Sequence, residues 1–417
     1  MEAYAKALLW AIPGFLVLVI FEVLYGHFKK KQTYTLMDTI SSLSSGISNT
    51  IKDSLGLAVV LVSYPFFLKH LAITSIPSSI WVFIIAFICI DFASYWSHRL
   101  NHKINIFWNQ HVIHHSSEEF NLACALRQSI SNIIGFNAIF LIPAAIFGIA
   151  PEVINILAPL HLFGQFWYHT RHIGKLGFLE YIFVTPSQHR VHHAINPIYI
   201  DKNLAAIFSV WDRLFGTFQE ELDSEPPIFG TLKPVSTWNP IWINFIHLWG
   251  LIKDAFYTQK ISDKFKIWFM PTGWRPKDVS LRFPRKPLED VSKQLKYNPP
   301  ATIFTKTWVL LQHLGTTSLL LFLLANFENL DFIQKLGLGG IVMMSIFSFS
   351  TVMDGRSWAI HFDIIRNCIG ILLLLIPDQG ILLKTTLPSL YWFAMGYFTI
   401  SLVSLIPLDS QLSLKTA

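Results

Sequence analysis

Histidines recur at spacings of three and four between apolar stretches long enough to cross a bilayer, and this pattern constrains the chain more than any other feature. Residues three and four apart share one face of a helix, so each histidine cluster can direct two or three imidazoles at a common point. Imidazole is the commonest protein ligand for metals and suits iron, zinc and copper. Ten of the sixteen histidines form four clusters: His98 and His102; His111, His114 and His115; His169 and His172; His189, His192 and His193.

The composition is that of an integral membrane protein. Of the 417 residues, 52% are hydrophobic and only 14% are charged, whereas soluble proteins carry about 25% charged residues. The net charge of +6 fits basic cytoplasmic loops facing anionic lipid better than it fits nucleic acid. The three cysteines are too far apart for a disulfide framework or an iron–sulfur site, so a metal would be held mainly by nitrogen. We predict an all-α, polytopic membrane protein with a cytosolic, histidine-rich cap.

Hydropathy predicts nine membrane spans, the first of which we interpret as a retained anchor rather than a signal peptide. Lys29, Lys30 and Lys31 place the end of this span in the cytoplasm, and strict alternation then leaves external loops 71–78, 150–151, 328–334 and 378–381 without lysine or arginine. The alternation requires a tight hairpin turned at Gly148 to Pro151. The predicted spans are 5–25, 54–70, 79–97, 130–149, 152–168, 305–327, 335–353, 360–377 and 382–407.

This alternation divides the chain into four segments and brings all the histidine clusters to the cytosolic face. A transporter would place ionisable residues near the bilayer midplane, whereas a site at the cytosolic edge can use O₂ and a soluble reductant, which favours an enzyme. A bacterial inner membrane and an endoplasmic reticulum location fit equally well. The segments are N-terminal transmembrane helices (1–97), a histidine-box catalytic region (98–218) that includes a membrane hairpin at about 130–168, a cytoplasmic cap segment (219–304) and C-terminal transmembrane helices (305–417).

Eight or nine imidazoles are too many ligands for one metal ion, so two ions sharing them is the simplest interpretation. Zinc hydrolysis in a membrane would use His-Glu-x-x-His, with the glutamate as general base, and no such motif occurs. Non-haem iron with O₂ fits better, because attack on an unreactive C–H bond requires a redox metal. The alternative from another class is a membrane protein that binds or transports metal without redox chemistry.

Three motifs resemble the fatty acid hydroxylase/sterol desaturase superfamily: His98-Arg-x-x-His102, Trp108-x-x-His111-x-x-His114-His115, and Pro186-x-x-His189-Arg-Val-His192-His193. Others resemble its ether-lipid branch, including Asn121-x-x-x-Ala-Leu-Arg-Gln-Ser, Tyr199-Ile-Asp-Lys-Asn and Trp211-Asp-Arg-Leu-Phe-Gly-Thr-Phe. The specific motifs span roughly 90–220, and a weaker likeness covers most of the chain.

The resemblance implies a diiron monooxygenase that uses O₂ to hydroxylate a lipid C–H bond, and in the ether-lipid branch this cleaves the ether bond of alkylglycerols. Sterol, carotenoid or fatty acyl hydroxylation or desaturation by the same centre is the alternative. The reductant would be a tetrahydropterin in that branch, or a redox protein. No catalytic residue is expected beyond the ligands to the two irons, which carry over as His98, His102, His111, His114, His115, His169, His189, His192 and His193.

Several polar residues around these motifs are expected to orient the ligands or to contact cofactor. His161 should pack or form hydrogen bonds, and the sequence leaves open whether His172 is a ligand. Lys103 and Arg171 stand where the branch commonly has acidic residues, which reverses the charge near the expected entrance for the reductant. The candidates for the supporting role are Glu118, Asn121, Asp201, Asn203 and Asp212.

Overall fold

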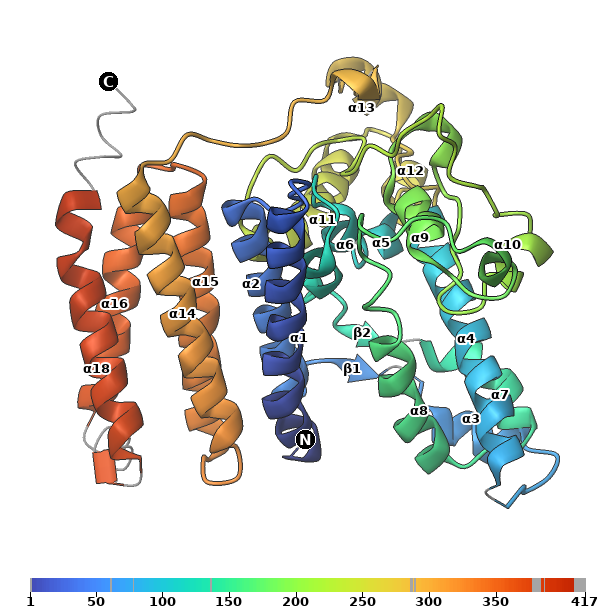
Figure 1. Ribbon diagram of the computed structural model, residues 1–417, viewed down its shortest axis with the longest axis horizontal. Helices are drawn as coiled ribbons and strands as arrows, with labels where there is room; N and C mark the ends of the chain where they lie inside the picture. Colours follow the sequence, from blue (N-terminus) through green and yellow to red (C-terminus); the bar gives the residue numbers. More distant parts are fainter. Residues whose placement is uncertain are drawn as a thin grey trace.

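The structure is a computed structural model that describes residues 2–408 apart from 61, 78, 136, 286–287, 289, 377–383 and 386. In the described part, the helices are accompanied by one two-residue parallel strand pair, β1 (Val59–Val60) with β2 (Ile134–Gly135), and by irregular connections. Five helices are long and apolar enough to cross a membrane, which confirms the predicted all-α membrane fold (Figure 1). They are α1 (Glu2–Phe28), α4 (Ile80–Lys103), α14 (Ile303–Ala325), α15 (Phe332–Met353) and α18 (Pro388–Val403), whose apolar stretch continues to Leu408.

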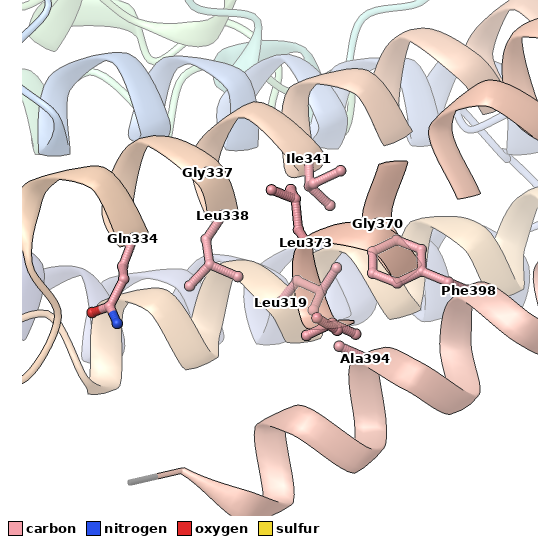
Figure 2. Close-up of a pocket in the computed structure, with 10 residues that line it drawn as sticks. Leu319, Gln334, Gly337, Leu338, Ile341, Gly370, Leu373, Ala394 and Phe398 are labelled. Atoms are coloured by element: carbon pink, nitrogen blue, oxygen red, sulfur yellow. The ribbon is translucent and has the colours of Figure 1, made fainter. Parts of the chain in front are cut away.

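Four helices at the C-terminal side form a bundle: α14, α15, α16 (Ala359–Leu375) and α18 (Figure 1). Capping residues mark the starts of two of these helices. Thr302 caps α14, and Asp331 forms a capping box with Gln334 at the start of α15. A small apolar pocket lies between the four helices, and Figure 2 shows Phe398 and Leu319 among its lining residues. Its lining residues come from α14, α15, α16 and α18 and include none of the ten histidines of the four sequence clusters, so this pocket is separate from them.

A buried ion pair holds α16 within this bundle. Arg366 Nη2 lies 2.6 Å from Asp363 Oδ1, and both side chains are almost completely buried. The same guanidinium donates to the Tyr397 hydroxyl of α18 at 2.9 Å and to Gln312 of α14 at 3.1 Å. Buried charges persist in such surroundings only when they are paired and hydrogen-bonded. The network therefore fixes α16 against two of its neighbours.

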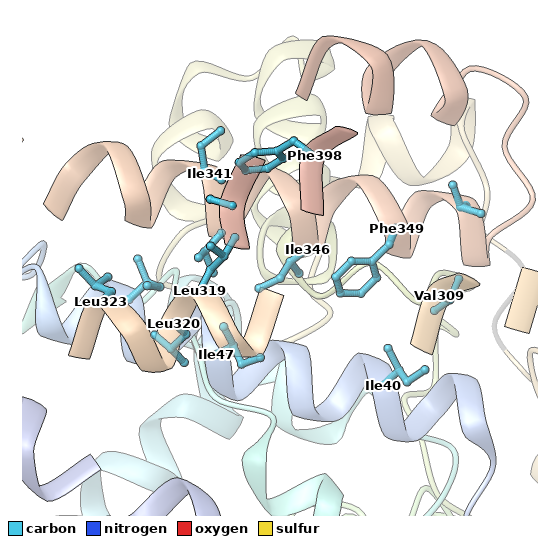
Figure 3. Packing of buried hydrophobic residues seen from close by; sticks show 14 of the residues in the cluster. Ile40, Ile47, Val309, Leu319, Leu320, Leu323, Ile341, Ile346, Phe349 and Phe398 are labelled. Carbon is cyan, nitrogen blue, oxygen red and sulfur yellow. The ribbon is translucent and has the colours of Figure 1, made fainter. Parts of the chain in front are cut away.

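Helix α2 (Leu36–Ser54) was missed by the hydropathy prediction. It packs against α14 and α15, and Ile40 and Ile47 join the hydrophobic core that these helices form (Figure 3). Its serines lower its hydropathy, yet they are buried, because small side chains let neighbouring helices approach closely. Ser44 Oγ lies 3.1 Å from His313 Nδ1 of α14, and Ser41 donates to the Trp238 carbonyl at 2.7 Å.

Two of the predicted spans are not continuous helices, and the prediction is wrong for both. In 54–70 the chain turns at Gly56, whose φ is +63°, and continues as β1 and the short helix α3 (Tyr64–Leu71). In 130–149 it forms β2, the 3₁₀ helix η2 (Asn137–Leu141) and α7 (Ile142–Ile146). The two segments pair with each other through β1 and β2, which satisfies backbone groups that a membrane interior would leave unpaired.

The chain turns at Gly148, between α7 and α8, and the membrane hairpin over about 130–168 stays a prediction. Gly148 has φ +69°, and a Cβ there would lie 1.9 Å from the Thr74 carbonyl oxygen, so only glycine fits. The following helix, α8 (Pro151–Phe163), is shorter than the predicted 152–168, and α16, with 17 residues, is also shorter than predicted. The predicted external loop 378–381 lies outside the described residues.

The helices alternate in direction, so that α1, α4 and α15 end on the side where α14 and α16 begin (Figure 1). The histidine segments lie on this side, which we call the histidine-bearing end. The remaining elements are α5 (Asn105–Trp108), α6 (Val112–His115), η1 (Leu122–Leu126), η3 (Gly177–Tyr181), α9 (Pro186–His193), η4 (Pro197–Tyr199), α10 (Val210–Leu214), α11 (Pro240–Tyr257), α12 (Ile261–Lys266), α13 (Lys277–Arg282) and η5 (Val291–Lys293).

Candidate metal centre

The nine histidines predicted as ligands form two adjacent groups. Within each group, one possible ligand atom per residue lies within 4.8 Å of all the others. The rings of His115 in one group and His193 in the other stack with centroids 4.4 Å apart. Helices α6 and α9 each supply both groups. Cluster A consists of His98, His102, His111, His115 and His192, and cluster B of His114, His169, His189 and His193.

In cluster A the Nε2 atoms of three rings converge. His111 Nε2 lies 2.9 Å from His98 Nε2 and 3.1 Å from His115 Nε2. The Nε2 atoms of His102 and His192 are buried and have no hydrogen-bond partner among the described residues. Nitrogen ligands at bonds of about 2.1 Å to one ion lie about 3.0 Å apart across a right angle. The spacing and the unpartnered nitrogens therefore fit a metal ion.

In cluster B the ring tautomers favour a cation. The Nδ1 atoms of His114 and His169 lie 3.3 and 3.1 Å from the carbonyl oxygens of Arg127 and Gln165, to which they donate. The Nε2 of each neutral ring then carries a lone pair. These two Nε2 atoms nevertheless lie 3.4 Å apart. Two lone pairs face each other favourably only when a cation lies between them, so the donor set fits a metal such as iron.

Burial keeps these imidazoles neutral. It lowers the pKa of His114 to about 3 and that of His111 well below its usual range, and neighbouring imidazoles lower both further. The pKa values of His115, His169, His189, His192 and His193 are lowered in the same way. Only a neutral imidazole can bind a metal, so the site is in its ligand form at neutral pH.

The segment that follows α9 orients the cluster A rings. The carbonyl oxygen of Leu204 accepts from His98 Nδ1 at 2.8 Å, and that of Lys202 accepts from His192 Nδ1 at 3.1 Å. Asp201 Oδ1 lies 3.4 Å from His102 Nδ1. Burial alone would raise the pKa of Asp201, but hydrogen bonds from His102 and Lys103 lower it to about 2.

Asn203 and Asp212 hold this segment in shape. Asp212 accepts from the backbone N–H groups of Leu204 and Ala205 at 2.7 and 3.0 Å. Asn203, with φ +50°, donates to the Gln188 carbonyl of α9 at 3.0 Å. Both residues therefore act on the histidines through the backbone rather than by direct contact.

Sequence reasoning missed Asp91, which ties α4 to the same segment. Its carboxylate is completely buried and accepts from the N–H groups of Ile207 and Phe208 and from Trp211 Nε1 at 2.9, 3.0 and 2.8 Å. It also accepts from His161 Nε2 at 2.7 Å, which confirms that His161 forms hydrogen bonds. An acidic residue inside an apolar span was the available signal.

Among the described residues, Glu118 and Asn121 form their hydrogen bonds with partners other than the histidines. Glu118 accepts from Gln294 Nε2 at 3.2 Å and from the Tyr297 N–H, so it ties the loop before α14 to the site region. Asn121 caps η1 and donates to the Thr33 carbonyl at 2.7 Å. His172 belongs to neither cluster, and its ring lies edge-on to Tyr25 of α1.

Lys103 and Arg171, the basic residues at positions where the ether-lipid branch commonly has acidic ones, have different surroundings. Lys103 Nζ donates to Asp201 Oδ2 at 2.6 Å, so the lysine shares its acidic partner with His102. The Arg171 guanidinium lies over the Phe229 ring, 5.9 Å from its centroid. Phe229 in turn stacks on Phe120, whose ring stacks on that of His169.

Comparison with known proteins agrees with this site. The sequence profile described as fatty acid hydroxylase matches residues 83–217, which contain all nine clustered histidines. Alkylglycerol monooxygenase of Homo sapiens is 35% identical over 304 residues, which cover 72% of this chain and 67% of that protein. The protein of the same name from Danio rerio is 32% identical over 405 residues, which cover 96% and 89%. Ornithine lipid hydroxylase of Rhizobium tropici is 26% identical over 174 residues, which cover 41% and 52%. No solved structure matches.

The chain therefore belongs to the fatty acid hydroxylase family, as its histidine motifs indicated. It is a membrane oxidoreductase that resembles alkylglycerol monooxygenase over most of its length.

Proposed function

We propose that the chain is a diiron monooxygenase that hydroxylates an alkylglycerol at the carbon next to its ether oxygen, so that the product collapses to a fatty aldehyde and glycerol. The observation that carries the proposal is the separation of nine imidazoles, six buried and three partly buried, into groups of five and four, because each group has enough donors to hold one iron ion. Two bound irons would supply the activation of O₂ and the oxidation of the C–H bond.

The chain's own residues would position the substrate and exclude water. Trp108 lies against the rings of His102 and His115, with centroids 5.2 and 5.5 Å away. On the other side, the buried rings of Phe120 and Tyr168 cover His169 and His189. These aromatic walls give the clusters dry, apolar surroundings, in which an alkyl chain binds more readily than water.

The ends of the apolar helices support a lipid substrate. His98 and His102 lie in the last two turns of α4, directly beyond its apolar stretch. A lipid in the neighbouring leaflet would therefore reach the site with its polar end first and its chain still in the bilayer. An ether carbon lies next to the polar end, which favours an alkylglycerol over oxidation far along an acyl chain.

The reductant we propose is a tetrahydropterin, by similarity to the ether-lipid branch. A redox protein should also be tested as the electron donor, because the basic side chains of Lys103 and Arg171 would raise the encounter rate with an acidic donor protein. Purified protein with an alkylglycerol should be assayed with tetrahydropterin alone, and separately with a ferredoxin or cytochrome b₅ system. Turnover with protein donors only, falling steeply with salt, would reject the pterin.

The decisive experiment combines metal analysis with isotope labelling. We expect two irons per chain, and ¹⁸O from ¹⁸O₂ in the aldehyde or its hydrate when an alkylglycerol is supplied. Sterols, carotenoids and fatty acids should be offered in parallel, since labelled product from one of these alone would reject the ether substrate but keep the oxygenase. Zinc alone, without O₂ consumption, would reject the oxygenase and favour a metal-binding protein.

A further inference from the structure

Five large apolar side chains of the segment α11–α13 point into solvent. Phe256, Ile261, Phe265, Phe269 and Leu281 are each 71–75% exposed, and together we call them the cap surface. Ile261, Phe265 and Phe269 are spaced four apart and form one stripe, while Ile267, between them in sequence, is completely buried. An exposed apolar group of this size indicates contact with a partner or a membrane.

The segments that carry these side chains meet at the end of α11. Lys264 of α12 donates to the carbonyl oxygens of Ala255 and Phe256 at 3.0 and 3.1 Å. Arg282 of α13 donates to the carbonyl oxygen of Tyr257 at 3.3 Å. The cap surface is therefore built around one point of the fold.

The same segment carries most of the net charge of the protein. Residues 253–285 contain eight lysines and arginines against three aspartates, a net charge of +5 in a chain of +6. Lys260, Lys266 and Lys277 are exposed, and the first two directly adjoin Ile261 and Phe265 in the sequence. This combination of exposed aromatic and basic residues complements an anionic lipid surface.

Backbone hydrogen bonds set the height of the cap surface relative to the bilayer. The N–H groups of Asn105 and Ile106, just beyond α4, donate to the carbonyl oxygens of Met270 and Trp268, both at 3.0 Å. Helix α4 has 24 residues and is about 36 Å long, whereas the hydrocarbon core is about 30 Å thick. The end of α4, and the segment bonded to it, therefore lie at the level of the lipid headgroups.

We infer that the cap surface lies in the headgroup layer of an anionic leaflet at the histidine-bearing end, with its aromatic side chains directed toward the acyl chains. Lysines at this level contact lipid phosphates, and the buried face of α12 remains packed on the protein. The bilayer is then a structural partner of α11–α13 and not only of the spanning helices.

Site-specific fluorescence tests this position. Cys368 is the exposed cysteine and Cys89 and Cys124 are buried, so single cysteines F256C, I261C and F265C can be labelled with bimane in a C368S background. L295C is the matched control, since Leu295 is 91% exposed but lies outside the cap surface. In nanodiscs containing nitroxide-labelled lipid, we expect at least about twofold stronger quenching at the three cap positions than at 295. Equal quenching at all four positions would overturn the inference.

A separate set of variants tests whether the cap surface binds anionic lipid through its lysines. Adding phosphatidylserine to phosphatidylcholine nanodiscs should increase quenching at position 265, and the combined change K260Q, K266Q and K277Q should abolish this increase. K293Q is the control, because Lys293 is equally basic and its side chain is 81% exposed. An increase that survives the triple change, or that K293Q abolishes equally, would reject anionic lipid as the partner. The readout does not require turnover, so it is independent of the proposed reaction.

Discussion

Thr170 donates a hydrogen bond of 2.5 Å to the carboxylate of Glu22, and so the apolar helix α1 is joined to the residue that follows His169. Glu22 is buried and also accepts from the Leu122 N–H at 2.8 Å and from the Tyr34 hydroxyl. An acidic residue on a largely exposed apolar helix is thus part of the support of cluster B.

Glu22→Ala should lower the stability of the fold and weaken metal binding at cluster B. Each hydrogen bond to a charged group contributes about 1.5–3 kcal/mol, and three would be lost. Thermal inactivation in detergent and iron content measure the effect, and Glu22→Gln should lie between Ala and the parent protein. Glu328→Gln is the control, because it removes an exposed ion pair between Lys6 of α1 and the 326–331 turn, and such pairs contribute about 0–1 kcal/mol. Equal losses in both variants would contradict the assigned role of Glu22.

Removing a histidine that serves one cluster should remove that cluster's ion. His98→Ala affects cluster A alone and His169→Ala cluster B alone, so each should reduce bound iron from two ions per chain to at most one and abolish turnover. The other clustered histidines should behave alike. His172→Ala should keep its iron and most of its activity. Near-normal turnover in two or more cluster variants would refute the ligand assignment.

The metal-free protein should lose stability as the pH falls below about 6.5. The pKa of His114 is about 3 in the folded state and about 6.5 when unfolded, so the unfolded chain binds the extra proton and stability rises with pH between these values. Each such histidine should cost about 1.4 kcal/mol per pH unit as the pH falls through this window. Melting temperatures between pH 7.5 and 5 measure the effect, and a flat profile would contradict it.

Asp201→Asn should weaken iron binding at cluster A about 10- to 100-fold, the usual effect of removing a carboxylate that orients a metal-binding histidine. The pKa of Asp201 is lowered to about 2, so its carboxyl group stays charged throughout the working pH range. Competition with an iron chelator gives the affinity. Glu118→Gln is the matched control, because Glu118 contacts Gln294 and Tyr297 rather than a histidine, and it should leave the affinity unchanged.

The predicted membrane topology can be tested with thiol labelling from one side. In the C368S background, cysteines at the exposed residues Ile73 and Phe332 should react with a membrane-impermeant reagent from outside the cytosol. Cysteines at Phe178 and Leu295 should react from the cytosolic side only, because basic residues concentrate in their loops. Labelling of positions 178 and 295 from opposite sides of the membrane would contradict the prediction that all histidine segments lie on one face.

The sequence singled out the nine histidines that the structure gathers, but not their division into two clusters, and their role as ligands stays a prediction. Spacings of three and four identify His189, His192 and His193 as neighbours on one helix, yet only the fold shows that His192 joins cluster A and the other two join cluster B. Asp91 was missed because its partners lie 70 or more residues away and carry no periodic pattern. His172 has ligand spacing but lies against α1 instead.

Hydropathy predicted the long spanning helices well, because their apolar stretches are continuous. It missed α2, where buried serines lower the hydropathy. It also predicted continuous helices over 54–70 and 130–149, where Gly56, Pro65 and Pro143 prevent a continuous helix. The boundaries of the four segments at 97, 218 and 304 stay predictions.

Helices α6 and α9 each contribute rings to both clusters, and this shared scaffold has a consequence for assembly of the enzyme. An ion captured in either cluster would order both short helices and would thereby preset the remaining donors of the other. Loading should therefore be cooperative, with a sigmoidal uptake curve and few half-filled molecules. A chelator that removes the ion from one cluster would lower the affinity of the other cluster for its ion, so few molecules with a single ion would accumulate.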